Sequence, residues 1–159
     1  MSTVIRTVRL AIPALAVALT WGGATLSAQK PAAAPRPVVL TASDQMKYDV
    51  VSIPATHGET LRIRLKAVGT MPKLAMSHNF VLLKAGSNAQ AFADKAINAR
   101  ATAFIPAELK GQVIASTSLI ADGEETEVTF TVPAAGRYDY LCTFPGHFAV
   151  GMKGVLVVK

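Results

Sequence analysis

The chain has 159 residues, a length that favours a single domain. Its 16 Lys and Arg outnumber its 10 Asp and Glu, which gives a formal net charge of +6. The basic residues do not cluster among aromatic residues, so the composition argues against a nucleic-acid-binding protein.

The N-terminal stretch has the pattern of a secretory signal peptide. Two arginines precede an apolar run at 10–19, and small residues follow at 22–28. The apolar run is shorter than the roughly 20 residues of a membrane-spanning helix. We therefore expect residues 1–28 to be a signal peptide and the protein to be exported to the periplasm or an equivalent compartment. An N-terminus that stays uncleaved and acts as a membrane tether is the alternative.

Residues 29–37 are rich in Pro and Ala, which is typical of an extended leader or short tether. The folded domain is therefore expected at 38–159. Within it, the stretch 61–66 alternates strictly between apolar and basic residues, as a half-buried strand does. Other short strands, separated by turns, are expected at 38–42, 46–53, 79–83, 112–120, 127–132, 138–142 and 154–159. This pattern predicts an all-β sandwich or barrel.

One stretch departs from the strand pattern. Ser87 and Gln90 have the spacing of a helix capping box, and the Ala-rich residues that follow recur at a helical period. Pro106 should stop the helix. We expect a short helical insertion around 88–104.

The segment 140–152 carries the only cysteine, a histidine and a methionine on one short loop. Cys142, His147 and Met152 are each separated by four residues. A lone cysteine in an exported protein cannot form an internal disulfide, so it is a reactive thiol, an intermolecular link or a metal ligand. Two His and one Cys with a weak axial Met is the arrangement of copper electron-transfer sites. With His78 as the second histidine, these residues predict one bound copper ion.

Each of these residues also has an ordinary explanation when taken singly. A lone Cys142 is usually a buried small apolar residue, His147 after a glycine is usually at the surface, and Met152 usually fills a core. The combination at this spacing favours the metal site. His57 lies in a polar turn and is expected to be solvated. Around the thiolate, we expect Asn79 to join the two ligand segments, with the backbone N–H groups of Asn79 and Phe144 as donors to the sulfur.

Two segments, Met76-Ser-His-Asn-Phe-Val81 and Cys142-Thr-Phe-Pro-Gly-His147, resemble the azurin branch of the cupredoxins. The resemblance implies a Greek-key β-sandwich with one mononuclear blue-copper centre. It implies that His78, Cys142 and His147 are equatorial ligands, that Met152 is axial and that the carbonyl of Ser77 lies on the opposite side as a possible weak axial contact. Azurins have three residues between the second histidine and the methionine, whereas this chain has four, as auracyanins do.

The resemblance also implies a function. It points to one-electron transfer between a donor and an acceptor redox protein in transient complexes, with His147 as the exit point. The expected partner patch is apolar and consists of Met71, Ala75, Met76, Phe144, Pro145, Phe148 and Ala149.

Four protein ligands leave no open position on the metal, which argues against an enzyme with a small-molecule substrate. We expect a monomer. A copper-binding protein for storage or delivery is the alternative function, and an enzyme with Cys142 as nucleophile and His147 as base is a third reading.

Overall fold

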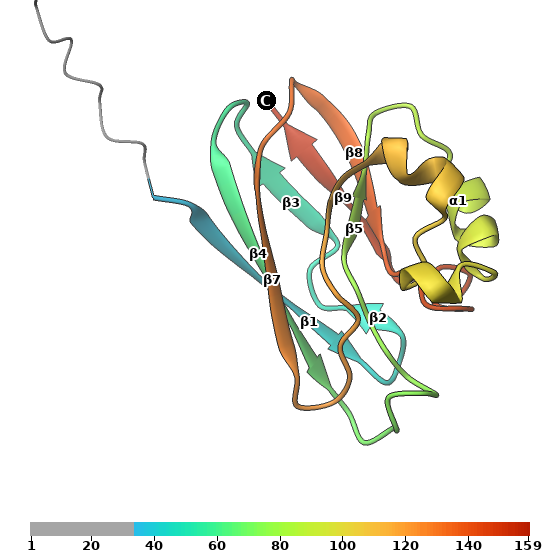
Figure 1. The fold of residues 1–159 in the computed structure, drawn as a ribbon. Coiled ribbons are helices and arrows are strands. Elements are labelled where there is room, and N and C mark those ends of the chain that lie inside the picture. The colour runs from blue at the N-terminus through green and yellow to red at the C-terminus, as the bar shows by residue number, and fades with distance from the viewer. Residues whose placement is uncertain (1–33) are drawn as a thin grey trace, which may run out of the picture. The chain divides into compact units, whose positions relative to one another are not determined.

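The structure, a computed structural model, describes residues 34–159 and contains two β-sheets that pack face to face (Figure 1). The expected signal peptide and most of the expected leader lie outside the described residues. One sheet has the strand order β2-β1-β4-β7 and the other β3-β9-β8-β5-β6. The strands are β1 (Arg36–Ser43), β2 (Lys47–Tyr48), β3 (Ser52–Ala55), β4 (Thr60–Val68), β5 (Val81–Leu83), β6 (Val113–Ser116), β7 (Glu125–Thr131), β8 (Gly136–Leu141) and β9 (Lys153–Val158).

The connections make this a Greek-key sandwich, as expected. The pairs β1–β4 and β3–β9 are parallel, and the remaining pairs are antiparallel. The first strand begins at Arg36 rather than at Val38, so the end of the Pro-rich stretch belongs to the sheet. Within residues 34–159, no helix is long and apolar enough to cross a membrane.

Strand β4 has one buried face and one exposed face, as its alternating sequence predicts. Leu61, Ile63 and Leu65 are fully buried, while the arginines between them are exposed. The outward face pairs with β7 through ion pairs such as Lys66 Nζ to Glu125 Oε1 at 2.9 Å. Such exposed pairs contribute roughly 0–1 kcal/mol each. The sheet therefore depends mainly on its buried face for stability.

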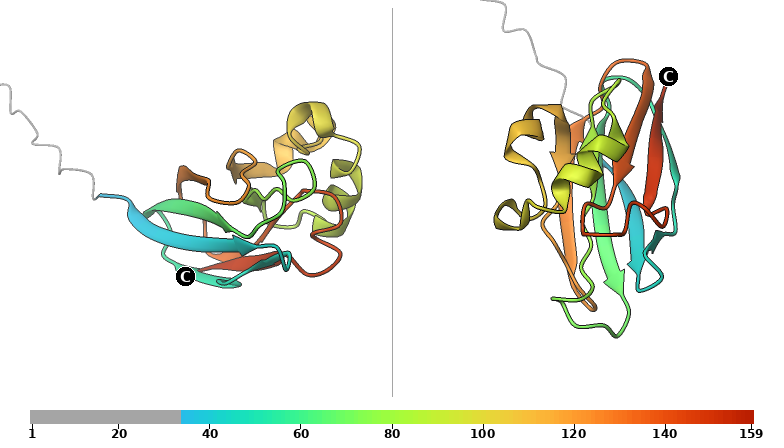
Figure 2. Two further views of the ribbon diagram at one scale, coloured as in Figure 1. Left: turned by 90° about the horizontal axis from the view of Figure 1, so that it is seen from below. Right: turned by 90° about the vertical axis from the view of Figure 1, so that its right-hand side faces the viewer.

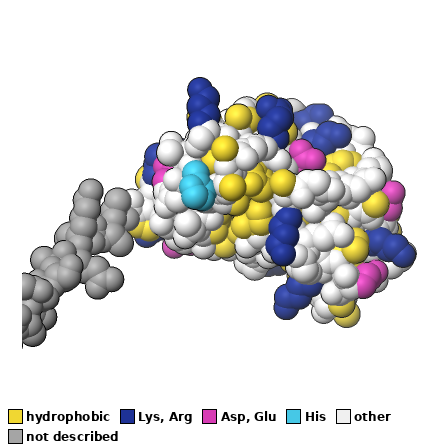
Figure 3. Space-filling model, turned by 90° about the horizontal axis from the view of Figure 1, so that it is seen from above, with side chains coloured by type: hydrophobic (Ala, Val, Ile, Leu, Met, Phe, Trp, Pro, Cys, Tyr) yellow, Lys and Arg dark blue, Asp and Glu magenta, His cyan; other side chains and the backbone are white. Residues whose placement is uncertain are grey.

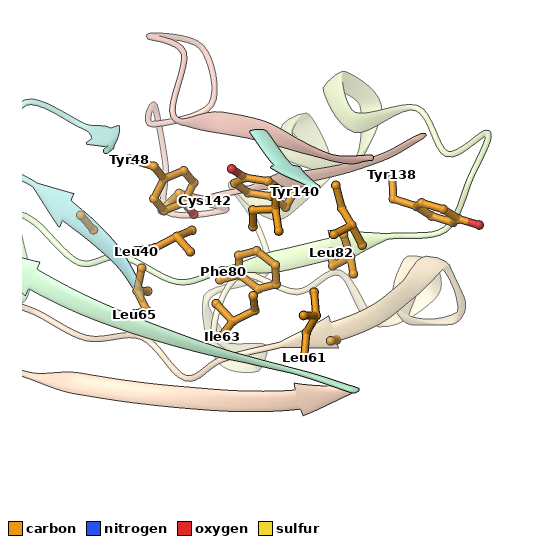
Figure 4. Packing of buried hydrophobic residues seen from close by; sticks show 14 of the residues in the cluster. Leu40, Tyr48, Leu61, Ile63, Leu65, Phe80, Leu82, Tyr138, Tyr140 and Cys142 are labelled. Carbon is orange, nitrogen blue, oxygen red and sulfur yellow. The ribbon is translucent and has the colours of Figure 1, made fainter. Parts of the chain in front are cut away.

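The core between the sheets is aromatic at its centre. Figure 4 shows Phe80 between Ile63 of one sheet and Tyr140 of the other. The rings of Phe80 and Tyr140 have centroids 5.2 Å apart, and the Tyr140 hydroxyl donates to the carbonyl of Val50 at 2.6 Å. Gly154, opposite Tyr140 in the β8–β9 register, leaves the room that this ring occupies.

The helical insertion lies outside the two sheets (Figure 2) and consists of α1 (Ala89–Ala96) and two 3-10 helices, η1 (Arg100–Thr102) and η2 (Ala107–Gln112). It extends past the expected end at 104 and takes Gln112 from the expected strand. The predicted capping box is wrong. The N-cap is Asn88, whose side-chain oxygen accepts from the backbone N–H of Ala91 at 3.0 Å, because the helix begins one residue later than the Ser87 box requires. Gln90 instead donates to Asp94 at 2.8 Å.

Candidate metal centre

The strand pair β8–β9 brings the two ends of the expected metal loop together. Leu141 pairs with Lys153, so Cys142 and Met152 extend directly from neighbouring strands. The backbone N–H of Cys142 donates to the carbonyl of Met152 at 3.1 Å. Both side chains are fully buried. The two sulfur atoms therefore come from fixed positions at the base of the loop.

Inside the loop, a tight turn returns His147 toward Cys142. The N–H of His147 donates to the carbonyl of Phe144 at 3.2 Å, and the N–H of Met152 donates to the carbonyl of His147 at 2.9 Å. Gly146 has a φ of +86°, in the left-handed region that glycine adopts without strain. The turn places Nδ1 of His147 3.5 Å from Sγ of Cys142.

His78 reaches the site from the segment before β5. Its backbone is held by reciprocal hydrogen bonds with Ile120, of 2.8 Å and 2.9 Å. One donor atom each from His78, Cys142 and His147 lies within 4.8 Å of the others. The rings of the two histidines have centroids 5.0 Å apart.

The donor atoms fit a soft metal ion. Nδ1 of His78 is buried and has no hydrogen-bond partner among the described residues. A buried polar atom without a partner costs about 1–3 kcal/mol, so it calls for an explanation. Two imidazole nitrogens and one sulfur, with a thioether beside them, are the ligand types that suit copper.

Burial sets the protonation of these groups in the absence of metal. It raises the pKa of the Cys142 thiol to about 12, and the backbone N–H groups of Asn79 and Phe144 partly oppose this by hydrogen bonding to the sulfur. Burial, together with neighbouring His78, lowers the pKa of His147 to about 4. Burial also lowers the pKa of His78, with Asp44 opposing. Both imidazoles are therefore neutral at pH 7 and offer lone pairs, while the thiol must lose its proton to a bound cation.

Asn79 joins the two segments that carry the donor atoms. Its side-chain nitrogen donates to Oγ1 of Thr143 at 2.8 Å, and its side-chain oxygen accepts from the N–H of Thr143 at 2.9 Å. The hydroxyl of Tyr48 donates to the carbonyl of Asn79. Because both bonded side chains are buried, this network fixes the distance between the segments.

Ser77 lies beside the thiol. Its carbonyl oxygen is 4.0 Å from Sγ of Cys142, and its hydroxyl donates to the carbonyl of Lys73 at 2.6 Å. The carbonyl therefore faces the sulfur, and the side chain points away into its own loop. His57 takes no part in the site. His57 is exposed, whereas His78 and His147 are each only 2% exposed, and Figure 3 accordingly shows little histidine surface on the face that it draws.

The expected partner patch is only partly at the surface. Phe148 is buried, because it packs with α1 and β5 residues while the ammonium of Lys153 covers its ring at 4.5 Å from the centroid. Phe148 therefore offers little surface to a partner, which the sequence did not indicate because an aromatic residue after a glycine-histidine pair can face either side. The other members keep some accessible surface: Met71, Ala75, Met76, Phe144, Pro145 and Ala149.

The helical insertion also contributes to the site, which no sequence pattern indicated. The ring of Phe104 packs edge-on against Phe144 at 5.3 Å between centroids, and Phe144 packs against His147 at 4.9 Å. Ala103 and Phe104 have φ values of 53° and 61°, which turn the chain toward the metal loop. A helical period at 91–104 could not have revealed this turn.

Comparisons with known proteins agree with this geometry. The family described as copper binding proteins, plastocyanin/azurin family, matches residues 37–159. The chain is 36% identical to auracyanin-A of Chloroflexus aurantiacus over 118 residues, which cover 73% of this chain and 69% of that protein. It is 41% identical over 118 residues to azurin-2 of Alcaligenes xylosoxydans xylosoxydans, covering 72% of this chain and 90% of the relative. The crystal structure of dithionite-reduced auracyanin from Roseiflexus castenholzii superposes with a TM-score of 0.70 at 33% identity, covering 80% of this chain and 99% of that one.

Proposed function

Because the chain belongs to the plastocyanin/azurin family of copper-binding proteins, we propose that His78, Cys142, His147 and Met152 hold its one copper ion. The family gives the class of function: the protein is a blue-copper electron-transfer protein, an electron carrier between redox partners. When bound, the copper supplies a one-electron Cu(II)/Cu(I) couple. The ligand assignment and the partner surface are the proposals that follow.

The observation that carries the proposal is a buried donor set that is already assembled. His78, Cys142 and His147 place their donor atoms within 4.8 Å of one another. Backbone hydrogen bonds at Ile120, Met152 and Phe144 hold these ligands in place. Ligands that need not move between oxidation states suit fast electron transfer. The Ser77 carbonyl, facing the sulfur, is the proposed weak axial contact.

The residues around the sulfur would tune the site. The N–H groups of Asn79 and Phe144 stabilise negative charge on Cys142, and the apolar surroundings exclude water. Four protein ligands would leave no coordination position for a substrate, so we propose that the protein is not an enzyme.

Electrons would enter and leave through His147 and the ring of Phe144 that packs on it. Contacts between electron-transfer proteins are typically small and transient. We propose that the protein acts as a monomer with transient donor and acceptor proteins, after export and removal of residues 1–28.

An absorption spectrum after addition of Cu(II) to the purified mature protein tests this function. We expect an intense visible thiolate-to-copper band that is bleached by reductant and absent in Cys142→Ser. A band that survives in Cys142→Ser would refute the ligand assignment. Copper that binds but does not cycle reversibly would instead favour storage or delivery.

A further inference from the structure

A hollow of about 730 Å³ opens beside the metal loop. Four segments surround it: the loop before β5, the helical insertion, the loop between β6 and β7, and the start of the metal loop. Its walls are Lys73, Leu74, Ser77, Ile97, Arg100, Ala101, Ala103, Phe104, Leu119, Phe144 and Pro145. Only Phe144 and Pro145 belong to the partner patch expected from the sequence.

Large apolar side chains stand at the rim of this hollow without cover. Leu74 is 83% exposed and Ile97 is 51% exposed. Phe104 also lines the hollow but is buried, with 8% of its surface exposed. Exposed apolar groups that gather around a concavity mark interaction sites, whereas single apolar residues scattered over a surface do not.

The charges at the rim are cationic. Lys73 and Arg100 are the only charged residues in the walls. Lys73 is neutralised by Glu124, with Nζ 2.7 Å from Oε2. Arg100 is exposed and forms no ion pair with any residue of the described domain. The hollow therefore combines an apolar surface with one guanidinium that is available to a carboxylate.

Two contacts connect the hollow to the metal ligands. Through Phe104 and Phe144, ring centroids lead to His147 in steps of 5.3 Å and 4.9 Å. Through Ser77, the wall presents a carbonyl 4.0 Å from the sulfur of Cys142. Phe144 therefore both lines the hollow and packs on His147.

We propose that this hollow is the docking site for a redox partner that presents an apolar segment flanked by carboxylates. The proposal rests on the electron-transfer function above and gives its partner a chemistry. Leu74 and Ile97 receive the apolar segment, and Arg100 pairs with the carboxylate. The docking surface thus extends over the helical insertion rather than over Phe148, which Lys153 covers.

The test measures electron exchange between the copper-loaded protein and two soluble c-type cytochromes of similar potential. Carboxylates surround the haem edge of one cytochrome, and lysines surround that of the other. With the carboxylate-rimmed cytochrome at low salt, Arg100→Glu should lower the second-order rate constant about tenfold. Lys84→Glu makes the same charge change on an exposed lysine outside the hollow and should change the rate less than twofold. With the lysine-rimmed cytochrome, Arg100→Glu should not slow exchange.

A second pair of variants tests the apolar contact without changing charge. Leu74→Ser should slow exchange with the carboxylate-rimmed cytochrome several-fold, while Val39→Ser, on an exposed valine of β1, should not.

Equal rates in Arg100→Glu and Lys84→Glu would overturn the docking site while leaving the electron-transfer function standing. Absence of the visible band, or of exchange with both cytochromes, in the unaltered protein would instead overturn the function itself. Concentration-dependent self-association that Leu74→Ser abolishes, or saturable binding of decanoate to the hollow, would assign the site to another occupant and refute the proposal.

Discussion

The metal loop at 142–152 and the helical insertion at 89–112 lie side by side but are built on different principles. Backbone hydrogen bonds tie the metal loop at its base and in its interior, and its sulfur and imidazole donors are buried. The insertion buries Phe92 and Ala96 of α1, while neither η1 nor η2 contains a buried residue. The contrast shows that two neighbouring segments can divide these tasks. The metal loop holds the donor atoms in fixed positions, and the insertion provides exposed surface for contact.

The largest expected effect is on stability and comes from replacing a glycine in each of the two regions by alanine. A Cβ on Gly154, at the base of the metal loop, would lie 2.2 Å from the ring of Tyr140. That ring is buried and its hydroxyl is hydrogen-bonded, so it cannot move aside easily. We expect Gly154→Ala to lower the free energy of unfolding by about 3 kcal/mol. Gly111→Ala in η2 meets nothing within 4 Å and should be nearly neutral. Urea denaturation of the metal-free proteins compares them, and similar midpoints would contradict the packing argument.

A somewhat smaller effect is expected at the buried asparagine. Asn79→Ala removes the three hydrogen bonds between its side chain and Thr143 and leaves the buried N–H of Thr143 without a partner. We expect a loss of about 2–3 kcal/mol in unfolding free energy and a shifted visible band in the copper-loaded protein. A loss of stability with an unchanged band would mean that the network does not position the thiolate.

The cap of α1 gives the corresponding test in the insertion. Asn88→Ala removes the hydrogen bond to Ala91 and should cost about 1 kcal/mol. Ser87→Ala is the matched control and should change stability by less than about 0.5 kcal/mol, because Ser87 does not cap the helix. The visible band should be the same in both. A larger loss of stability for Ser87→Ala than for Asn88→Ala would show that Ser87 caps the helix after all.

The smallest effect concerns pH. The hydrogen bond from Lys73, followed by that from the N–H of Ala121, holds the pKa of Glu124 below its ordinary value. Because the folded pKa is depressed, the ionised carboxylate stabilises the fold above the pKa of the unfolded state. That stabilisation is lost as the pH falls through the folded pKa. We expect Glu124→Gln to be slightly less stable than the unaltered protein at pH 7 and equally stable at pH 3, as measured by thermal unfolding. A difference in stability between the two proteins that grows as the pH falls would contradict a lowered pKa of Glu124.

The same substitution sharpens the docking comparison. Glu124→Gln leaves the ammonium of Lys73 without its ion pair at the rim of the hollow. Exchange with the carboxylate-rimmed cytochrome should become faster at low salt. The gain should disappear at high salt, where exposed charges are screened.

The metal loop could be predicted from the sequence because its constraints are local. Cys142, His147 and Met152 flank a Pro-Gly turn between two apolar runs, and this order leaves few ways to close the chain. The alternation of Leu61, Ile63 and Leu65 likewise determines which face of β4 is buried.

The insertion could not be predicted to the same depth. The N-cap of its helix is Asn88 rather than Ser87, and the sequence does not separate them because Asn and Ser are similarly favourable caps. The burial of Phe148 depends on α1 and β5, which are distant in sequence. The same holds for the hollow, since Leu74, Ile97 and Phe144 meet only in the folded chain.

The β8–β9 hairpin also bears on the order in which the site assembles. Its two strands are joined by the metal loop itself, so their pairing closes a short stretch of chain. His78 arrives only with β5, through contacts that span 64 residues to Thr143. Pairings of low sequence separation form sooner during folding than distant ones. A full-length chain folding from the unfolded state would therefore form the hairpin with Cys142, His147 and Met152 before His78 is in place, so an ion that meets the chain at that stage encounters only three of the four proposed donors.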